Sequence, residues 1–184
     1  MSKLIMWNLI SLDGFFEGDE PWSLDWFRSL FDDELQQHSL EQLRATDMLV
    51  FGRRTYEGMA AYWSPERGDV ANFMNSLPKV VFSRTLDRAE WHNTTLIKGD
   101  VASEMRRLKE LGKKDIFLYG SADLSATLVR EGLFDEYRLC LVPVVLGNGT
   151  PLFGRNTGRV NLKLLEARPL SSGCVILRYA AELP

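Results

Sequence analysis

Short apolar runs alternate along the chain with longer segments whose apolar residues recur at helical spacing. The short runs, bounded by turn residues, predict strands at Leu4–Ile10, Met48–Phe51, Lys79–Ser83, Leu96–Ile97 and Asp115–Tyr119. The periodic segments predict helices at Arg53–Tyr62, Val70–Leu77, Val101–Leu111 and Ser121–Glu131, and one bent helix or two short ones within Leu24–Thr46. This alternation predicts a mostly parallel sheet with helices on both faces.

The last part of the chain contains strands only. Glu136–Val145 reads as a long strand, and Asn161–Ala167 and Cys174–Ala180 flank a Ser-Ser-Gly turn. Two such runs around a turn predict an antiparallel hairpin. The expected fold class is therefore α/β, with a mixed, mostly parallel sheet and an antiparallel C-terminal hairpin.

Composition bounds the class of protein. The 184 residues suit one domain with its own core, which we expect to span residues 1–184. A content of 45% hydrophobic and 26% charged residues is typical of a soluble globular protein and argues against disorder or a coiled coil. The net charge of −3 gives no electrostatic reason to bind nucleic acid or an anionic membrane.

Cysteine and histidine chemistry is limited. Cys140 and Cys174 lie in apolar runs and are expected to be buried and reduced. His38 and His92 are expected at the surface, which disfavours a metal site or a Ser–His–Asp triad. Because these residues form no Cys/His cluster, we expect no metal. No leader-like cleavage pattern and no apolar stretch of roughly 18–20 residues are present, so we expect a cytoplasmic protein.

Three predicted parallel strands end in small, hydroxylated or basic residues: Gly52-Arg53-Arg54-Thr55, Ser83-Arg84-Thr85 and Gly120-Ser121-Ala122. Ligands of such sheets bind at the carboxyl ends of the strands, where helix N-termini and arginines attract phosphate. Each end alone also fits an ordinary turn with solvated arginines, or with Ser121 as a helix cap. No Gly-x-Gly-x-x-Gly or phosphate-loop motif is present, and we interpret Gly147-Asn148-Gly149 as a flexible loop.

Aromatic residues are concentrated near the N-terminus. Phe27 and Phe31 have helical spacing and are expected in the core. Trp22 lies in a glycine-containing loop and fits a ligand pocket or the core equally well. Asp25 follows it at a helix start, where it is either a proton donor in an apolar pocket or an ordinary acid favoured by the helix dipole.

The order of these segments resembles the dihydrofolate reductase superfamily. The closer resemblance is to the branch that contains the reductase domain of the riboflavin-pathway deaminase–reductase and its stand-alone relatives. The matching pieces cover nearly the whole chain: Ser11-Leu12-Asp13-Gly14, Gly52-Arg53-Arg54-Thr55-Tyr56-Glu57-Gly58, Pro78-Lys79-Val80-Val81-Phe82-Ser83-Arg84-Thr85-Leu86, Gly120-Ser121-Ala122-x-Leu124, Gly132-Leu133-x-Asp135-Glu136-Tyr137, and Pro143-Val144-x-Leu146-Gly147-x-Gly149 followed by Leu152-Phe153. Each piece is short, but their shared order is a specific signal.

The resemblance implies a three-layer α/β/α fold and an NADPH-dependent reductase of a small pterin- or aminopyrimidine-like heterocycle, similar to 5-amino-6-(5-phosphoribosylamino)uracil reductase. The family's Gly-Arg-x-Thr stretch contacts the cofactor phosphates, the next strand end holds the 2′-phosphoadenosine end, and a glycine pair accepts the pyrophosphate. The arginines also favour NADP over NAD. The candidate cofactor-binding residues are Gly52, Arg53, Arg54, Thr55, Ser83, Arg84, Gly120, Ser121, Ala122 and Leu124.

In this family the Ser-Leu-Asp-Gly loop lies beside the nicotinamide and the substrate. Together with the aromatic loop, this gives Asp13, Trp22, Tyr56 and Tyr119 as candidate substrate-binding residues and Asp25 as the candidate catalytic carboxylate. The resemblance also implies a homodimer, for which the strand at 136–145 or the terminal hairpin is the candidate interface.

Three departures from the family pattern keep other functions open. Ser121 replaces the second glycine of the pair, and Tyr119 stands where the riboflavin-pathway enzymes carry a glutamate. Their substrate-loop pattern is missing between Gly18 and Arg28, where Pro21-Trp22 and Asp25 look more like dihydrofolate reductase. The alternatives are a dihydrofolate reductase-type activity, an NADP(H)-binding module without turnover, and a carrier of apolar ligands.

Overall fold

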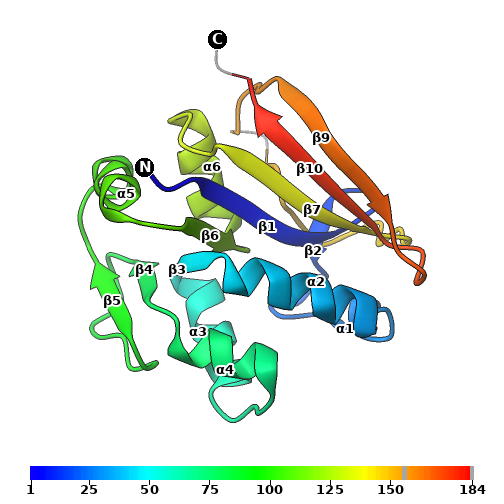
Figure 1. The fold of residues 1–184 in the computed structure, drawn as a ribbon, viewed down its shortest axis with the longest axis horizontal. Helices are drawn as coiled ribbons and strands as arrows, with labels where there is room; N and C mark the ends of the chain where they lie inside the picture. The colour runs from blue at the N-terminus through cyan, green and yellow to red at the C-terminus, as the bar shows by residue number, and fades with distance from the viewer. Residues whose placement is uncertain (155–156, 183–184) are drawn as a thin grey trace.

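The computed structural model describes residues 1–154 and 157–182, and an eight-stranded sheet runs through its centre (Figure 1). Six neighbouring strands run parallel, and the C-terminal strands form an antiparallel edge. In spatial order the strands are β5 (Thr94–Ile97), β4 (Lys79–Phe82), β3 (Thr46–Gly52), β6 (Asp115–Tyr119), β1 (Leu4–Ser11), β7 (Glu136–Val142), β10 (Val175–Ala181) and β9 (Leu162–Pro169).

Helices cover both faces of this sheet because its central strands are apolar on both sides. In β1, Leu4 and Met6 enter one buried cluster, and Ile5 and Trp7 enter the other. The Ile5 side packs against α2 (Asp33–Arg44), α3 (Arg53–Trp63) and α4 (Asp69–Ser76). The Leu4 side packs against α5 (Val101–Leu111) and α6 (Ala122–Arg130). The predicted α/β fold with three layers is therefore confirmed.

The segment between Leu24 and Thr46 forms two helices, α1 (Asp25–Arg28) and α2. Asp32 starts the second one, because its Oδ1 accepts a hydrogen bond from the Leu35 N–H at 2.9 Å. Phe31 falls in the connection and is 41% exposed, so its predicted place in the core is wrong. Phe27 packs against the core, as predicted.

The predicted C-terminal hairpin is confirmed as β9 and β10. Strand β7 pairs with β1 on one side and with β10 on the other, so neither of its edges is available to another subunit. Strand β9 is instead the edge strand, and its side chains Leu162, Leu164 and Leu165 are exposed. Of the two candidate interfaces, the hairpin alone offers a free edge.

The sequence did not indicate two short strands, β2 (Phe15–Glu17) and β8 (Thr150–Pro151), which form a small antiparallel sheet. They connect the loop after β1 to the loop after β7. Asp13 strengthens this connection by accepting hydrogen bonds from the N–H groups of Leu146 at 3.1 Å and Gly147 at 2.7 Å. Asp13 thus anchors the start of the loop at 147–149, while the flexibility of this loop stays a prediction.

Cys140 and Cys174 are buried and form no disulfide, as predicted. His92 is exposed, also as predicted, but His38 is only 8% exposed. The predicted surface position of His38 is wrong because Arg168 of β9 reaches over α2 and donates a hydrogen bond to its ring. Sequence periodicity could not anticipate this contact between segments 130 residues apart.

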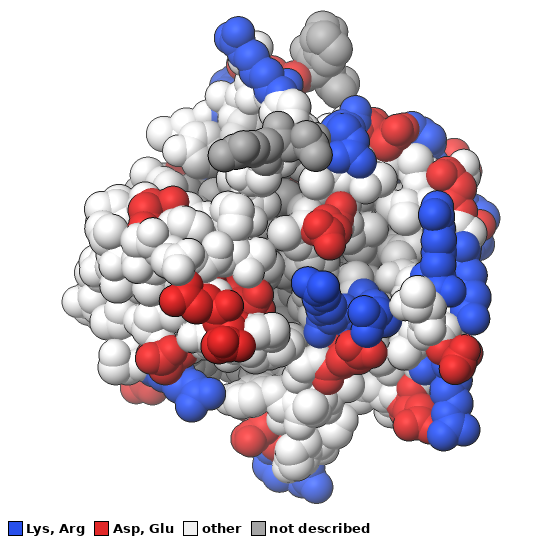
Figure 2. Space-filling view, turned by 180° about the vertical axis from the view of Figure 1, so that it is seen from behind, with Lys and Arg blue, Asp and Glu red and all other residues white. Residues whose placement is uncertain are grey.

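On the face seen in Figure 2, Lys and Arg side chains lie close to Asp and Glu side chains, without a continuous basic patch. This distribution fits the net charge of −3 and gives no broad surface for a polyanion on that face. Within residues 1–154 and 157–182, no helix is both long and apolar enough to cross a membrane. The same residues contain no group of three or more His, Cys, Asp or Glu placed to hold a metal ion.

Candidate functional site

The carboxyl ends of β4, β3 and β6 lie side by side at one edge of the sheet. Gly52 pairs in register with Phe82 of β4, and Val50 pairs with Leu118 of β6. The residues that follow each strand, Ser83 on one side and Gly120 on the other, therefore flank Gly52. The structure thus brings together the three strand ends identified in the sequence.

Ser121 joins two of these strand ends. Its Oγ accepts a hydrogen bond from the Gly52 N–H at 2.7 Å. Ser121 is the residue before α6, with φ of 62°, but its side chain caps none of the helix N–H groups. Ser121 therefore occupies the N-cap position of α6, as one alternative predicted, but its hydroxyl caps no helix N–H and bridges to the neighbouring strand end instead.

Gly120 occupies a position that only glycine fits well. Its φ is +58°, a left-handed conformation, and a Cβ there would lie 3.0 Å from Cγ2 of Thr55. Its N–H donates to Oδ1 of Asn8 at 3.0 Å. The turn between β6 and α6 is thus packed closely against the start of α3.

Asn8 is a residue of this site that the sequence analysis did not select. It is 5% exposed, and its Nδ2 has no acceptor among the residues that the structure describes. A buried N–H without a partner is costly, so it indicates an acceptor from a ligand or a water. The signal in the sequence was a single polar residue within the apolar run Leu4–Ile10.

Helices α3 and α6 both begin at this edge without a side-chain cap. Helices α2 and α5 differ, since Asp32 and Asp100 cap them through the N–H groups of Leu35 and Ser103. Uncapped first-turn N–H groups carry partial positive charge and bind oxyanions. Two such helix starts, held together through Ser121, make an edge suited to a pyrophosphate.

Arg53, Arg54 and Arg84 are exposed around this edge. Nη1 of Arg53 lies 3.2 Å from Oε2 of Glu57, and both side chains are almost half exposed, so the pair is weak and can rearrange. Oγ of Ser83 accepts the Leu86 N–H at 2.9 Å, which shapes the turn that carries Arg84. The edge therefore has adaptable positive charge beside its helix starts.

Two further candidate residues lie on α6. Leu124 is 7% exposed and packs in the core, so it positions the helix. Ala122 lines a pocket of about 450 Å³ between α6 and β8, together with Asp123, Ala126, Arg130, Thr150, Pro151 and Gly154. This pocket adjoins the turn that follows β6.

Asp13 is exposed in the loop after β1. The Ser11 hydroxyl, and next the N–H groups of Gly147 and Leu146, hold the pKa of this carboxyl below its usual value, although burial opposes them. The side chain is therefore ionised at neutral pH. In that state Asp13 can accept hydrogen bonds but cannot act as a general acid.

Trp22 bridges the N-terminal loop and α3. Its indole covers Gly58 so closely that a Cβ there would overlap the ring, and its backbone N–H donates to Oε2 of Glu17 at 2.9 Å. Asp25 is exposed in the first turn of α1, with the Ser23 hydroxyl 3.4 Å from its Oδ1. This setting suits an ordinary helix N-terminal acid better than a proton donor in an apolar pocket.

The two candidate tyrosines differ in setting. Tyr56 is 4% exposed and its hydroxyl accepts the backbone N–H of Trp91 at 2.9 Å, which gives it a structural role in the core. Tyr119 ends β6, where its ring lies near Phe51 and Phe117. Burial raises the pKa of the Tyr119 hydroxyl well above its usual range, so it stays protonated and can donate.

The family model of the RibD C-terminal domain matches residues 2–176 of the chain. The chain belongs to the RibD C-terminal domain family. A relative in this family, the uncharacterized protein YyaP of Bacillus subtilis (strain 168), is 34% identical over 183 residues, which cover 96% of this chain and 94% of YyaP. The resemblance inferred from the short motifs is confirmed at the level of family and branch.

Solved structures confirm the fold. A protein provisionally assigned to riboflavin biosynthesis from Shewanella sp. PV-4 superposes with a TM-score of 0.78 at 22% identity, over 98% of this chain and 99% of that chain. Dihydrofolate reductase from Enterococcus faecalis, in a complex with NADP(H), superposes with a TM-score of 0.64 at 12% identity, over 98% and 97% of the two chains. This chain therefore has a dihydrofolate reductase-like architecture.

Proposed function

We propose that this member of the RibD C-terminal domain family is an NADPH-dependent reductase of a small pterin- or aminopyrimidine-like heterocycle. The observation that carries the proposal is the pair of uncapped helix starts, α3 and α6, held together by the Gly52–Ser121 hydrogen bond. Such a pair suits the pyrophosphate of a dinucleotide, and the exposed arginines beside it suit an additional phosphate.

The residues at this edge fit the cofactor. The first-turn N–H groups of α3 and α6 would hold the pyrophosphate, and Gly120 leaves free the space that a Cβ would fill. Arg53 and Arg84 would pair with the 2′-phosphate, with Arg54 and Ser83 nearby, and the unpaired Nδ2 of Asn8 would donate to a cofactor oxygen. When bound, NADPH supplies the hydride.

We place the substrate beside the loop that carries Asp13 and Trp22. The Trp22 indole offers a flat apolar face to a heterocycle, the protonated Tyr119 hydroxyl can donate a hydrogen bond, and the ionised Asp13 can accept one. Asp25 and an ordered water are the two candidates for the proton. We leave Tyr56 out of this site because its hydroxyl is engaged in the core.

The test is a panel of pterins and aminouracil derivatives, with and without a ribose phosphate, in which loss of NADPH absorbance is followed together with formation of the reduced product. We expect at least one compound to be reduced. Saturable NADPH binding with no turnover across the panel would favour the alternative of a binding module. That alternative is suggested by Tyr119, which stands where the riboflavin-pathway enzymes carry a glutamate.

Arg53→Ala and Arg84→Ala are each expected to weaken NADPH binding by roughly tenfold and to change NADH binding little, because charge-assisted bonds to the additional phosphate are lost. Dissociation constants for both nucleotides measure this. Arg88→Ala is the matched control, since Arg88 pairs with Glu90 and is 80% exposed. Equal losses for the two nucleotides would contradict the assignment to the 2′-phosphate.

We also propose a homodimer that uses the edge of β9. Leu162, Leu164 and Leu165 are 38%, 53% and 49% exposed there, which is unusual for leucine on an unpaired edge strand. Leu164→Lys is expected to shift the protein to a monomer in sedimentation analysis. A wild-type monomer at high concentration would contradict the proposal.

A further inference from the structure

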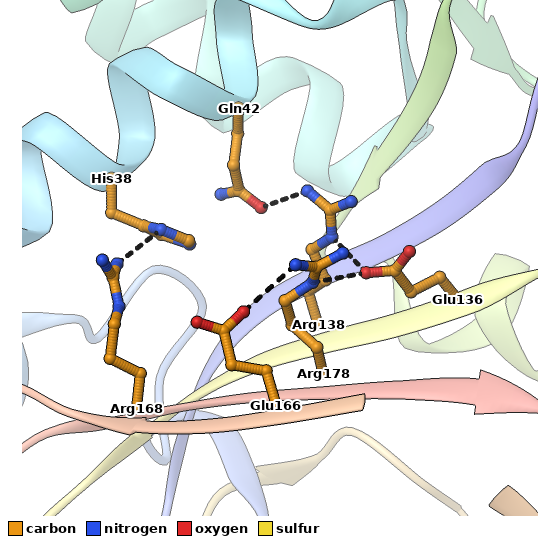
Figure 3. Close-up of polar contacts among 7 residues, drawn as sticks. All are labelled: His38, Gln42, Glu136, Arg138, Glu166, Arg168 and Arg178. Atoms are coloured by element: carbon orange, nitrogen blue, oxygen red, sulfur yellow. Dashed lines mark hydrogen bonds and ion pairs between the residues drawn. The ribbon is translucent and has the colours of Figure 1, made fainter. Parts of the chain in front are cut away.

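A cluster of charged and polar side chains lies between α2 and the β9–β10 hairpin (Figure 3). Arg178 of β10 pairs in register with Arg138 of β7 and Glu166 of β9, which places the three in one row across the sheet. A pocket of about 270 Å³ lies above them, lined by His38, Glu41, Gln42, Ala45, Arg138, Glu166, Arg168 and Arg178. None of these residues belongs to the proposed cofactor and substrate site.

Carboxylates neutralise two of the three arginines. Oε1 of Glu136 accepts from Nε of Arg138 at 2.6 Å and from Nε of Arg178 at 2.7 Å, and Oε2 of Glu166 accepts from Nη1 of Arg178 at 3.1 Å. Arg168 forms no ion pair with any residue that the structure describes. Of the three arginines, it is the one whose guanidinium bonds no carboxylate among those residues, although Glu34 interacts with it electrostatically.

The donor and acceptor roles of His38 and Gln42 follow from their arginine partners. A guanidinium can only donate, so Nδ1 of His38 accepts from Nη2 of Arg168 at 2.8 Å, and the ring hydrogen resides on Nε2. By the same reasoning Oε1 of Gln42 accepts from Nη1 of Arg138 at 3.3 Å, which turns its amide NH₂ away. Burial, with the charges of Arg168 and Arg138, lowers the pKa of His38 to about 4, so the ring is neutral at pH 7.

Three buried N–H groups around this pocket then have no acceptor among the described residues: Nε2 of His38, Nε2 of Gln42 and Nε of Arg168. His38 and Gln42 are 8% and 3% exposed, so bulk water does not provide the acceptors for their N–H groups. All three unpaired groups are donors. The missing partner is therefore a species rich in acceptor oxygens, with negative charge to match Arg168.

We propose that this pocket binds phosphate. Phosphate oxygens would supply acceptors for the unpaired donors of His38, Gln42 and Arg168, which all line the pocket. Glu166 and the exposed Glu41 also line the pocket and would repel an anion that carries only acceptors. Inorganic phosphate at neutral pH keeps at least one O–H, which can donate to Glu166, whereas sulfate has none.

The chain offers a site-specific probe, because His38 and His92 are its only histidines. The experiment is a titration with inorganic phosphate at constant ionic strength, followed through the histidine ring signals by NMR. We expect a saturable change of the His38 signal by about 10 mM phosphate and no change of the exposed His92 signal. Sulfate is expected to bind more weakly, and a small phosphate monoester in a parallel titration shows whether the ligand is free phosphate or a phosphate group of a larger molecule.

Arg168→Gln is expected to weaken the phosphate response of His38 at least tenfold. Two controls are expected to leave this response unchanged. Arg88→Gln removes an exposed charge elsewhere, and Arg84→Ala removes an arginine of the proposed cofactor edge. Circular dichroism and a cooperative thermal transition check that each variant is folded. Gln42→Leu provides a second test, because it removes a donor without changing the charge. The proposal would be overturned if phosphate left the His38 signal unchanged, if chloride changed it equally, or if the response survived Arg168→Gln. A His38 signal that depends on protein concentration and not on phosphate would also overturn it.

Discussion

Replacing Glu136 with glutamine is expected to lower the free energy of unfolding by about 3 kcal/mol at neutral pH. Glu136 is 2% exposed and its Oε1 lies within 2.7 Å of both Arg138 and Arg178. These two arginines face each other directly across β7 and β10, an arrangement of like charges that is unfavourable without a shared anion. Glutamine keeps the shape but leaves Arg138 without a carboxylate partner among the described residues, and leaves Arg178 with the half-exposed Glu166 alone. Chemical denaturation measures the loss.

Glu166→Gln is the matched control, because Glu166 is 38% exposed and bonds Arg178 alone. Its loss is expected to stay below about 1 kcal/mol. Burial would raise the pKa of Glu136, but its hydrogen bonds to Arg138 and Arg178 outweigh burial and lower it. A lowered pKa stabilises the fold above the unfolded-state value, so the difference between wild type and Glu136→Gln should be full above about pH 4.5 and shrink below it. Equal losses in the two variants would contradict this account.

Gly120→Ala is expected to weaken NADPH binding at least tenfold, or about 1.4 kcal/mol. The added methyl group would lie 3.0 Å from Cγ2 of Thr55, so the start of α3 and the turn before α6 would have to separate. These are the two elements that we propose to hold the pyrophosphate. A direct binding titration measures the effect.

Gly132→Ala separates this effect from backbone strain. Gly132 also has a left-handed φ, of +62°, but nothing lies within 4 Å of the place that an added Cβ would occupy. Both variants are expected to lose about 1 kcal/mol of stability from the backbone conformation, and only Gly120→Ala should lose NADPH affinity. An equal loss of NADPH affinity in both would show that the turn after β6 has no special role in binding.

Hydrophobic periodicity predicted every long element of the sheet and its helices, because the central strands are apolar and the helices amphipathic. The three strand ends could also be predicted, since in a parallel sheet their position follows from strand order alone. Strands β2 and β8 could not, because they are short and are defined by pairing between residues more than 130 positions apart.

The misjudged residues share one physical cause, namely contacts between distant segments. His38 is polar and lies on a polar helix, yet Arg168 covers it from β9. Ser121 has the residue type of a helix cap, yet its hydroxyl bonds the Gly52 N–H of another strand. Asn8 lies in an apolar run, and its amide oxygen accepts the Gly120 N–H, which belongs to a segment more than 100 residues away. Local sequence rules carry no information about such partners.

The most direct test of the central claim is a titration of the purified protein with NADPH and then with NADH, followed by quenching of its five tryptophans. Trp22 covers α3 close to the proposed site, so a bound nicotinamide should reach a native reporter. We expect saturable quenching by both nucleotides, with NADPH bound at least tenfold more tightly. The absence of saturable binding by either nucleotide would contradict the assignment of the strand ends to a cofactor, and the proposed reductase function with it.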